Sequence, residues 1–261
     1  NKYTTFVPDL NETNENMNKQ KRFMLDESEL PRQWYNIAAD MPNKPLPPLN
    51  PATKEPLTVE ELSHIFAKEC AKQELDQEHA WIDIPEEVQE RYRYYRSTPL
   101  VRAYALEEAL GTPAHIYFKN ESVNPLGSHK VNSAIPQCYY CKQEGTTNVT
   151  TETGAGQWGA ALSYAAKTFG LECAVYQVKI TMQQKPYRSS IMRTFGATVE
   201  GSPSMSTRAG KDIITRDPHH PGSLGTAISE AVELATTTPN CKYTLGSVLN
   251  HVSLHQTIIG L

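Results

Sequence analysis

The sequence contains no long apolar run. Among its 261 residues, no stretch of 18 or more consecutive apolar residues occurs, and a transmembrane helix needs roughly that many. The first 21 residues also lack the apolar core of a secretory signal. We therefore expect neither a membrane-spanning segment nor a membrane partner. Because the chain begins with asparagine rather than methionine, we also expect that its true N-terminus is missing.

Cysteine is scarce and irregularly spaced. The five cysteines are Cys70, Cys138, Cys141, Cys173 and Cys241. Their odd number argues against a disulfide scaffold and fits a reducing compartment. Cys138 and Cys141 form a C-x-x-C motif, but no second Cys pair or Cys/His pair lies at zinc spacing. The sequence therefore predicts that these two thiols lie on a buried or half-buried helix, that no metal ion is bound and that the protein is cytoplasmic.

The sequence also has no block of basic residues. Lys and Arg number 25 against 29 Asp and Glu, which gives a net charge of −4 with both signs spread along the chain. Nucleic-acid-binding proteins carry a basic patch, so we expect no nucleic-acid partner. Apolar residues make up 39% and charged residues 21% of the chain, which supplies enough apolar material for a buried core.

The N-terminal part shows little hydrophobic periodicity. Residues 1–23 are rich in Asn, Glu, Lys and Thr, and this composition predicts a disordered tail. Six prolines between Met41 and Pro56 exclude a regular helix and predict an extended segment. Thr58, with a glutamate three residues later, predicts a capped helix over 58–74.

From Ser97 onward, strands and helices are predicted to alternate. The predicted strands cover 114–118, 148–151, 172–178, 197–200 and 242–245. The predicted helices cover 128–141, 157–169, 186–195 and 225–234. Repeated strand–helix units imply a parallel sheet covered by helices on both faces, so the expected fold class is α/β. Residues 258–261 form an apolar run without a capping signal, and we expect a truncated chain.

The segment from Asn120 to Asn132 places a lysine at the start of a predicted helix. A strand ends there, a turn with proline and glycine follows, and Ser128 can cap the next helix. Lys130 then lies in the first helical turn, where the helix dipole lowers the affinity of its amine for a proton. A neutral lysine amine can attack an aldehyde. Most lysines are solvated surface charges, however, and position alone does not separate the two roles.

A second segment, from Thr151 to Gly159, joins a strand to a helix through glycines. Gly154 and Gly156 allow a ligand to approach the backbone closely, and the free N–H groups at the start of the helix can hold a carboxylate. Glu152 lies at the end of the strand, where ligands bind in open α/β sheets. Beside an anion its pKa would rise, and it could act as an acid or base. The alternative is an ordinary turn with a surface glutamate.

Together these segments resemble a known family. The pair G-S-H-K-V-N and T-E-T-G-A-G-Q-W-G, about one strand–helix unit apart, is similar to the tryptophan synthase β family, especially its second, stand-alone-type branch. The further matching segments, in the family's order, are Arg96–Leu100, Gln184–Pro186, Arg188–Gly196, Pro221–Gly225 and Gly246–Leu249. The resemblance covers about residues 30–261.

The resemblance implies a fold, a cofactor and a set of site residues. The implied fold is the three-layer parallel sheet of fold type II, and the implied cofactor is pyridoxal 5′-phosphate (PLP). The implied catalytic residues are Lys130, which bonds to the cofactor aldehyde, and Glu152, the acid/base. The implied cofactor-binding residues are Lys130, His129, Asn132, Gln157 and Ser223. The implied substrate-carboxylate loop consists of Thr153, Gly154, Ala155, Gly156, Gln157 and Trp158.

The implied reaction is a β-replacement. L-serine, or an activated serine, loses its β-substituent and indole adds to give L-tryptophan, with PLP as the electron sink. A homodimer is the implied assembly. The better-known branch has His in place of Trp158, which supports the second branch and leaves pairing with an α subunit in doubt. The family's glycine-rich phosphate cup and its partner for the pyridine nitrogen lie beyond Leu261. Residues 24–261 are therefore predicted to form an incomplete domain, the N-terminal lobe plus the start of the C-terminal lobe.

Other functions fit parts of the sequence. The chain could be another fold type II enzyme, such as a relative of threonine synthase or serine dehydratase, or a truncated, non-catalytic paralogue that binds a partner. His251 and His255 have the spacing of a metal pair on a helix but no acidic residue between them, so packing is preferred. Lys185, Arg188 and Arg193 could attract a phosphorylated substrate, although a solvated helix face is preferred.

Overall fold

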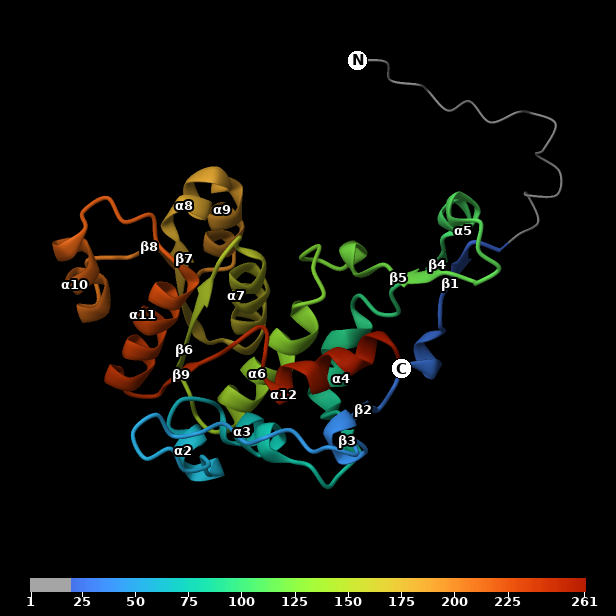
Figure 1. The fold of residues 1–261 in the computed structure, drawn as a ribbon, viewed down its shortest axis with the longest axis horizontal. Helices are drawn as coiled ribbons and strands as arrows, with labels where there is room; N and C mark the ends of the chain where they lie inside the picture. Colours follow the sequence, from blue (N-terminus) through green and yellow to red (C-terminus); the bar gives the residue numbers. More distant parts are fainter. Residues whose placement is uncertain (1–19) are drawn as a thin grey trace, which may run out of the picture.

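The computed structural model describes residues 20–261 (Figure 1). The strands are β1 (Arg22–Phe23), β2 (Gln33–Tyr35), β3 (Trp81–Asp83), β4 (Leu100–Arg102), β5 (Tyr117–Lys119), β6 (Asn148–Thr153), β7 (Glu172–Val178), β8 (Thr198–Ser202) and β9 (Cys241–Tyr243). The α-helices are α2 (Val59–Ser63), α3 (Lys68–Leu75), α4 (Glu86–Arg93), α5 (Tyr104–Leu110), α6 (Val131–Gln143), α7 (Gln157–Phe169), α8 (Lys179–Gln184), α9 (Pro186–Thr194), α10 (Arg208–Arg216), α11 (Leu224–Thr237) and α12 (Asn250–Gln256). The short 3-10 helices are η1 (Glu27–Glu29), η2 (Ile37–Ala39), η3 (Glu121–Val123) and η4 (Thr257–Ile259). Most of the predicted tail, residues 1–19, falls outside the described residues, and its last two residues form β1.

A parallel sheet lies at the centre of the main body. Its four strands follow the order β8-β7-β6-β9, and every neighbouring pair is parallel. The helix α11 packs against one face, and α7 covers the other face with α6 and α9 packed against it (Figure 1). The predicted α/β class with its three-layer parallel sheet is therefore confirmed.

Alternate residues of β7 belong to opposite layers. Cys173 and Val175 pack into the core cluster that contains α7, whereas Tyr176 and Val178 pack against α11. Successive side chains of a strand point to opposite faces, so a strand with apolar residues on both faces, as in β7, is typical of a sheet buried on both sides. The composition of this strand thus explains why helices cover both faces.

Helix α7 matches the helix predicted over 157–169 residue for residue. Gly170, with φ +68°, ends it in the left-handed conformation. Where α7 faces the sheet, a Cβ at Gly159 would lie 2.5 Å from Met192 Sδ and 2.9 Å from Val175 Cγ1. The missing side chain lets α7 approach β7 closely, and this approach holds the loop before α7 against the end of β6.

The predicted capped helix over 58–74 is two helices. The cap is confirmed, because Thr58 Oγ1 accepts a hydrogen bond from Glu61 N at 3.2 Å. The helix breaks after Ser63, and α3 begins at Lys68. At the break, Ile65 O accepts a hydrogen bond from Tyr243 N at 2.9 Å. The contact with β9 therefore competes with helix continuation, which the local pattern could not reveal.

The strand predicted at 114–118 does not join the parallel sheet. It is β5, it begins at Tyr117, and it pairs antiparallel with β4, which also pairs antiparallel with β1. This small sheet and α5 extend away from the main body (Figure 1). A second antiparallel pair, β2 with β3, was also not predicted.

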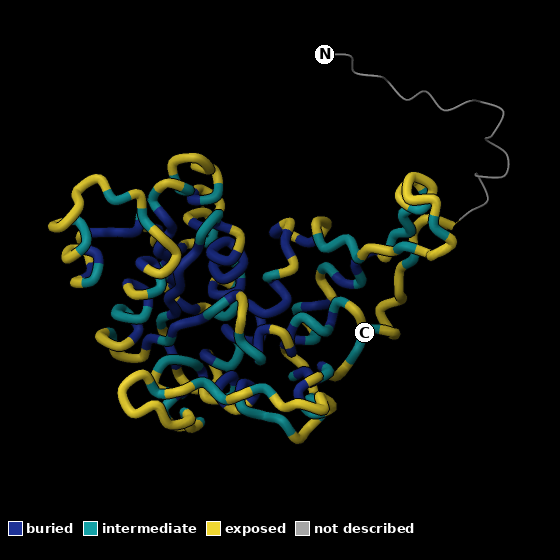
Figure 2. Tube along the Cα trace, viewed as in Figure 1, coloured by how far each residue is buried: buried dark blue, intermediate teal, exposed yellow. Residues whose placement is uncertain are grey.

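The buried residues gather around the parallel sheet and its helices, while the small sheet is largely exposed (Figure 2). All five cysteines are free and buried, and for Cys138 and Cys141 this agrees with the predicted buried or half-buried helix. Burial raises the pKa of the Cys173 thiol to about 12, so this thiol is inert at neutral pH. No helix among residues 20–261 combines the length and apolarity needed to cross a membrane.

A chain of buried polar side chains crosses this core. His255 Nε2 lies 2.9 Å from Gln73 Oε1, and His255 Nδ1 lies 3.1 Å from Ser133 Oγ. Ser133 Oγ accepts a hydrogen bond from Gln137 Nε2 at 2.9 Å. These contacts fit a neutral His255 that donates to Gln73 and accepts from the Ser133 hydroxyl. Burial, and then the neighbouring His251, lower the pKa of His255 well below its usual value.

We expect His255 to make the protein less stable as the pH falls below about 6.5, the usual pKa of histidine. The folded state keeps His255 neutral while the unfolded state takes up a proton, so its contribution to stability is lost by about 1.4 kcal/mol per pH unit until the folded pKa is reached. Urea unfolding at a series of pH values should show a shallower loss for His255→Gln than for the wild type. The exposed His64 offers a matched control, and equal pH slopes for wild type and His255→Gln would contradict the prediction.

Candidate active site

The carboxyl end of β6 faces a cavity of about 110 Å³. Its walls come from the start of α6, the β6–α7 loop, the start of α11 and the segment after β9. The lining residues are Lys130, Glu152, Thr153, Gly154, Ala155, Gln157, Trp158, Leu224, Gly246 and Ser247. Ligands bind at this edge of open α/β sheets. The structure thus brings the two predicted motifs together in one cavity.

Lys130 immediately precedes α6, and its side chain lines the cavity. Its Nζ donates a hydrogen bond to Gly246 O at 2.6 Å. Lys130 is itself the N-cap residue, so the prediction that Ser128 caps the helix and that Lys130 lies in the first turn was wrong. Ser128 Oγ instead lies 3.4 Å from Lys130 N. Burial lowers the pKa of Lys130, and the charge of Glu152 opposes this shift.

Glu152 lines the same cavity from β6. It is 4% exposed, and Tyr243 OH donates a hydrogen bond to Glu152 Oε2 at 2.5 Å. Burial raises the pKa of Glu152, and the hydrogen bond from Tyr243 and the charge of Lys130 offset this only in part. A buried carboxyl with a raised pKa can hold and release a proton near neutral pH. Tyr243 was not predicted for the site, because only the pairing of β6 with β9 brings it beside Glu152.

We expect Tyr243→Phe to raise the pKa of Glu152 further. The phenol stabilises the ionised carboxylate, and a hydrogen bond to a charged group contributes about 1.5–3 kcal/mol, which corresponds to roughly one to two pH units. Infrared difference spectra of the carboxyl stretch, recorded as the pH is varied, measure this shift. Tyr94, which is 74% exposed, gives the control variant Tyr94→Phe. A Glu152 titration that is unchanged or lowered in Tyr243→Phe would refute the expectation.

The loop between β6 and α7 presents backbone to the cavity. Gly156 has φ +94°, and a Cβ there would lie 2.6 Å from Arg188 Cβ, so only glycine fits. Thr181 Oγ1 donates to Gly154 O at 2.5 Å and ties the loop to α8. The first N–H groups of a helix have no helical acceptor, and the helix dipole favours an anion there. The start of α7 can therefore hold a carboxylate.

Trp158 forms a wall that is fixed on two sides. Its Nε1 donates to Thr151 Oγ1 at 2.7 Å, and Thr151 Oγ1 donates to Thr244 O at 2.6 Å. The indole ring lies against Gly246, because a Cβ at Gly246 would lie 2.3 Å from Trp158 Cδ2. The residue whose carbonyl binds Lys130 is thus also the residue on which Trp158 rests.

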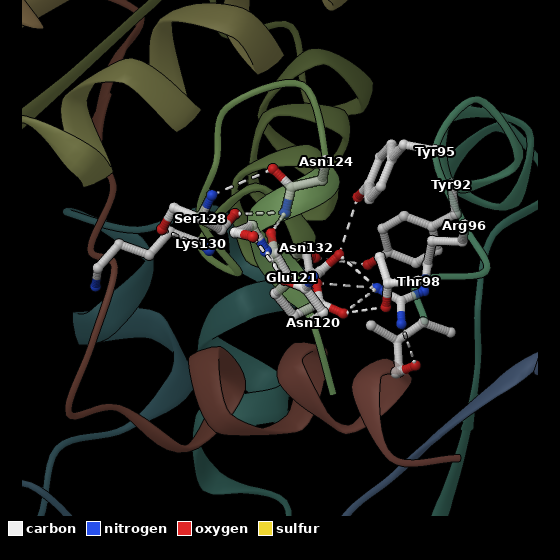
Figure 3. A network of polar contacts seen from close by, with 12 residues as sticks. Tyr92, Tyr95, Arg96, Thr98, Asn120, Glu121, Asn124, Ser128, Lys130 and Asn132 are labelled. Carbon is white, nitrogen blue, oxygen red and sulfur yellow. Dashed lines mark hydrogen bonds and ion pairs between the residues drawn. The ribbon is translucent and has the colours of Figure 1, made fainter. Parts of the chain in front are cut away.

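Four residues predicted for the site do not line the cavity. Gly156 shapes the loop from outside it, and His129 is exposed. Ser223 caps α11 and is exposed, although the next residue, Leu224, does line the cavity. Asn132 is fully buried and turned away from the cavity. In Figure 3 the Lys130 side chain points away from the group of residues around Asn132.

Asn132 belongs to a buried polar group, here called the Arg96 cluster, which consists of Tyr95, Arg96, Thr98, Glu121 and Asn132 (Figure 3). Arg96 and Glu121 form an ion pair at 3.3 Å, and their side chains are 2% and 11% exposed. Asn132 Nδ2 donates to Glu121 Oε2 at 3.0 Å, and Asn132 Oδ1 accepts from Arg96 Nη1 at 3.1 Å. Arg96 Nη2 also donates to Ile258 O at 3.0 Å, so Arg96 connects Asn132 in α6 with η4.

The histidines with metal-pair spacing pack in the core. His251 Nδ1 lies 2.9 Å from Glu74 Oε2, and His255 belongs to the polar chain described above. Within residues 20–261, no group of three or more possible metal ligands occurs. Packing, the preferred interpretation of this pair, is what the structure shows.

The chain is similar to known proteins over most of its length. The family model for pyridoxal-phosphate dependent enzymes matches residues 92–251. The chain is 56% identical over 237 residues to tryptophan synthase beta chain 2 of Thermotoga maritima, which covers 91% of this chain and 56% of that protein. It is 53% identical over 250 residues to tryptophan synthase beta chain 2 of Methanosarcina mazei, and the aligned region covers 96% of this chain and 56% of that protein. Among solved structures it is similar to a pyridoxal 5′-phosphate-dependent aspartate racemase, with 24% identity, 66% and 47% of the two chains covered and a TM-score of 0.48. The chain spans about half the length of the curated relatives it matches.

Proposed function

Because the chain belongs to the pyridoxal-phosphate dependent enzyme family, we propose that it carries the cofactor lysine and the acid/base residue of an enzyme that makes L-tryptophan from L-serine, or an activated serine, and indole. One observation carries the proposal: Lys130 and Glu152 line the same cavity at the carboxyl end of a parallel strand. The relatives that are named tryptophan synthase beta chain 2 support this reaction.

The residues around the cavity fit the aldehyde end of PLP. They supply an amine with a lowered pKa, a carboxyl with a raised pKa and the N–H groups at the start of α7. We propose that Lys130 bonds to the aldehyde carbon, that Gln157 contacts the cofactor, and that His129 and Ser223 lie at its rim. When bound, the cofactor supplies an electron sink for negative charge on the substrate. Asn132, whose amide is held in the Arg96 cluster, would act through that cluster.

In the proposed reaction, Lys130 and Glu152 divide the proton transfers. Once the amino group of serine has replaced Lys130 at the cofactor aldehyde, the released amine of Lys130, whose neutral form burial favours, could accept the proton from Cα of serine. Burial also favours the protonated carboxyl of Glu152, which can protonate the β-oxygen of serine as it leaves. The loop from Thr153 to Trp158 would bind the substrate carboxylate through its N–H groups.

The proposal also covers the setting of the enzyme. L-serine and indole are the proposed substrates, a homodimer the proposed assembly and the cytoplasm the proposed location. The five free cysteines support a reducing compartment. The homodimer rests on the family resemblance, and an α subunit is not part of the proposal.

Trapping of the cofactor tests the role of Lys130. The purified chain is mixed with PLP, its absorbance spectrum is recorded, and the mixture is reduced with borohydride and mapped by peptide mass. We expect a band near the visible edge and a pyridoxyl group on Lys130, both lost in Lys130→Ala. A label on another lysine would overturn the assignment. If the wild type shows no band, the experiment is repeated with the chain fused to the C-terminal half of the Thermotoga maritima relative. The absence of a band in this fusion would refute the proposal.

Product analysis tests the reaction on the same extended protein. With serine and indole we expect L-tryptophan. Formation of a keto acid from serine, with or without indole, and no tryptophan would instead indicate a serine dehydratase-like enzyme. The absence of any product despite a label on Lys130 would favour the non-catalytic alternative.

A further inference from the structure

We propose that Asn124 is a positioning residue for Lys130, because its side-chain amide holds the loop that carries the lysine. This loop, residues 121–130, is called the lysine loop below. The inference rests on the proposed role of Lys130 as the reactive amine. It concerns a residue that does not line the cavity.

The amide of Asn124 is bound at both ends within the lysine loop. Its Nδ2 donates to Glu121 O at 2.7 Å and to Ser128 O at 2.8 Å. Its Oδ1 accepts from Leu126 N at 3.1 Å and from Ser128 N at 3.2 Å. The N–H and the C=O of Ser128 are thus both bound by one side chain (Figure 3). Asn124 is 5% exposed, so water cannot readily replace these hydrogen bonds.

Ser128 is the last buried residue before the lysine. Gly127, with φ +62°, turns the chain just ahead of it, and His129 after it is exposed. Lys130 then leads into α6 as the N-cap residue. A lysine side chain is long, so a small rotation of the peptide at Ser128 displaces Nζ from Gly246 O. The bonds of Asn124 oppose this rotation.

The other side of Lys130 is fixed by the Arg96 cluster. Asn132, two residues further along, donates to the Glu121 carboxylate at 3.0 Å. Glu121 therefore anchors both sides of the lysine, through its carbonyl to Asn124 and through its carboxylate to Asn132. Held in this way, the amine of Lys130 stays at its half-buried place, where burial lowers its pKa and Glu152 is the charged group that acts on it.

Direct ligand binding does not explain Asn124. A carboxamide offers two donor hydrogens and two acceptor positions, and four hydrogen bonds within the lysine loop occupy them. The side chain has no group left for a substrate or cofactor. Its effect on the chemistry must therefore pass through the lysine loop.

The chain offers a matched control at Asn36. This residue is also 5% exposed, and its Nδ2 donates to Asp76 O at 2.9 Å and to His79 O at 3.1 Å. Its Oδ1 accepts from Ala38 N at 3.2 Å. Asn36→Ala and Asn124→Ala each remove a buried amide that binds a loop, and both should destabilise the protein. Only Asn124→Ala should alter Lys130.

Competitive labelling reads out the amine of Lys130 without the cofactor. Acetylation of every lysine with trace acetic anhydride, quantified by peptide mass at a series of pH values, gives an apparent pKa for each amine. In the wild type we expect Lys130 to titrate below the ordinary value for a lysine, because burial lowers its pKa. In Asn124→Ala the apparent pKa of Lys130 should rise by about one pH unit, because a loosened loop lets the amine reach water. The milder Asn124→Ser, which keeps a hydroxyl, should lie between the two.

An unchanged titration of Lys130 in folded Asn124→Ala, or an equal shift in Asn36→Ala, would overturn the inference. If Asn124→Ala does not fold, Asn124→Ser carries the same comparison. The labelling experiment needs no PLP. Failure of the wild type to trap PLP would therefore count against the proposed function alone, while a shift confined to the Asn124 variants would still support the positioning role.

Discussion

Arg96→Met is expected to lower the free energy of unfolding by about 3–5 kcal/mol, the usual cost of removing one partner of a buried ion pair. The side chain of Arg96 is 2% exposed, and that of Glu121 is 11% exposed. Methionine keeps the apolar stem but leaves the Glu121 carboxylate buried without its cation. The hydrogen bond from Arg96 to Ile258 O is lost as well. The start of α6, which carries Asn132, should loosen with it.

The pKa of Glu121 gives this prediction a pH dependence. Burial raises the pKa of Glu121, but Arg96 and the hydrogen bonds from Thr98 and Asn132 outweigh burial, and the net pKa lies below its usual value. A depressed carboxyl pKa stabilises the fold above the unfolded pKa of about 4.3 and loses this effect as the pH falls further. The difference in stability between the wild type and Arg96→Met should therefore be largest near neutral pH.

Urea unfolding of wild type, Arg96→Met and a surface control measures this loss. Arg93 pairs with Glu27 at 3.6 Å, and the two side chains are 39% and 70% exposed. Solvent screens such a pair, so Arg93→Met should cost much less. Adding Glu121→Gln to Arg96→Met should restore part of the loss, because it removes the stranded charge. A loss in Arg96→Met no larger than that in Arg93→Met would show that the buried pair contributes little.

Gly246→Ala is expected to damage stability and cofactor attachment together. Its Cβ would lie 2.3 Å from Cδ2, 2.5 Å from Cε3 and 2.6 Å from Cγ of Trp158. Trp158 cannot simply swing aside, because its Nε1 is held by Thr151. Overpacking of this kind costs about 1–3 kcal/mol. Any shift that relieves it moves the carbonyl that binds Lys130.

Thermal unfolding and PLP trapping by Lys130 measure the two effects of Gly246→Ala. Gly225 is the matched control, since a Cβ there would meet only Ser223 Oγ at 3.9 Å. Because Gly225 lies in α11, alanine should there be neutral or slightly stabilising. A smaller residue at position 158, as in Gly246→Ala combined with Trp158→Leu, should recover part of the stability. Wild-type melting and wild-type trapping in Gly246→Ala would contradict the contact between Trp158 and Gly246.

Local patterns and motifs predicted the main layers of the fold and two of the residues that line the cavity, Lys130 and Glu152. The bounds of α7 and β7 were predicted residue for residue, because an alanine-rich helix ends at a glycine and a mostly apolar strand follows. The meeting of Lys130 with Glu152 was also predicted. That prediction came from the family's motifs, which contain both residues, because the strand before Lys130, β5, lies outside the parallel sheet.

Contacts between distant segments could not be predicted in this way. Tyr243 and Glu152 are 91 residues apart in the sequence, and the residues around each of them do not predict the hydrogen bond between them. The pattern of β5 shows a strand but does not name its antiparallel partner, β4. Asn124 precedes a proline and lies near a glycine, as asparagines in turns often do. Its four hydrogen bonds therefore could not be predicted from the residues around it. Local sequence describes elements, whereas pairing and register depend on the whole chain.

The hydrogen bond between Lys130 and Gly246 joins residues 116 positions apart, and this separation has a consequence for folding. Contacts of high sequence separation form late, after the loop between them has closed. While the chain emerges from the ribosome, Lys130 is exposed long before its acceptor has been made. In the nascent chain Lys130 is therefore a solvated amine, and the burial that lowers its pKa is acquired only when β9 and the residues that follow it have docked. The proposed attachment of the cofactor to Lys130 would therefore follow the docking of these segments.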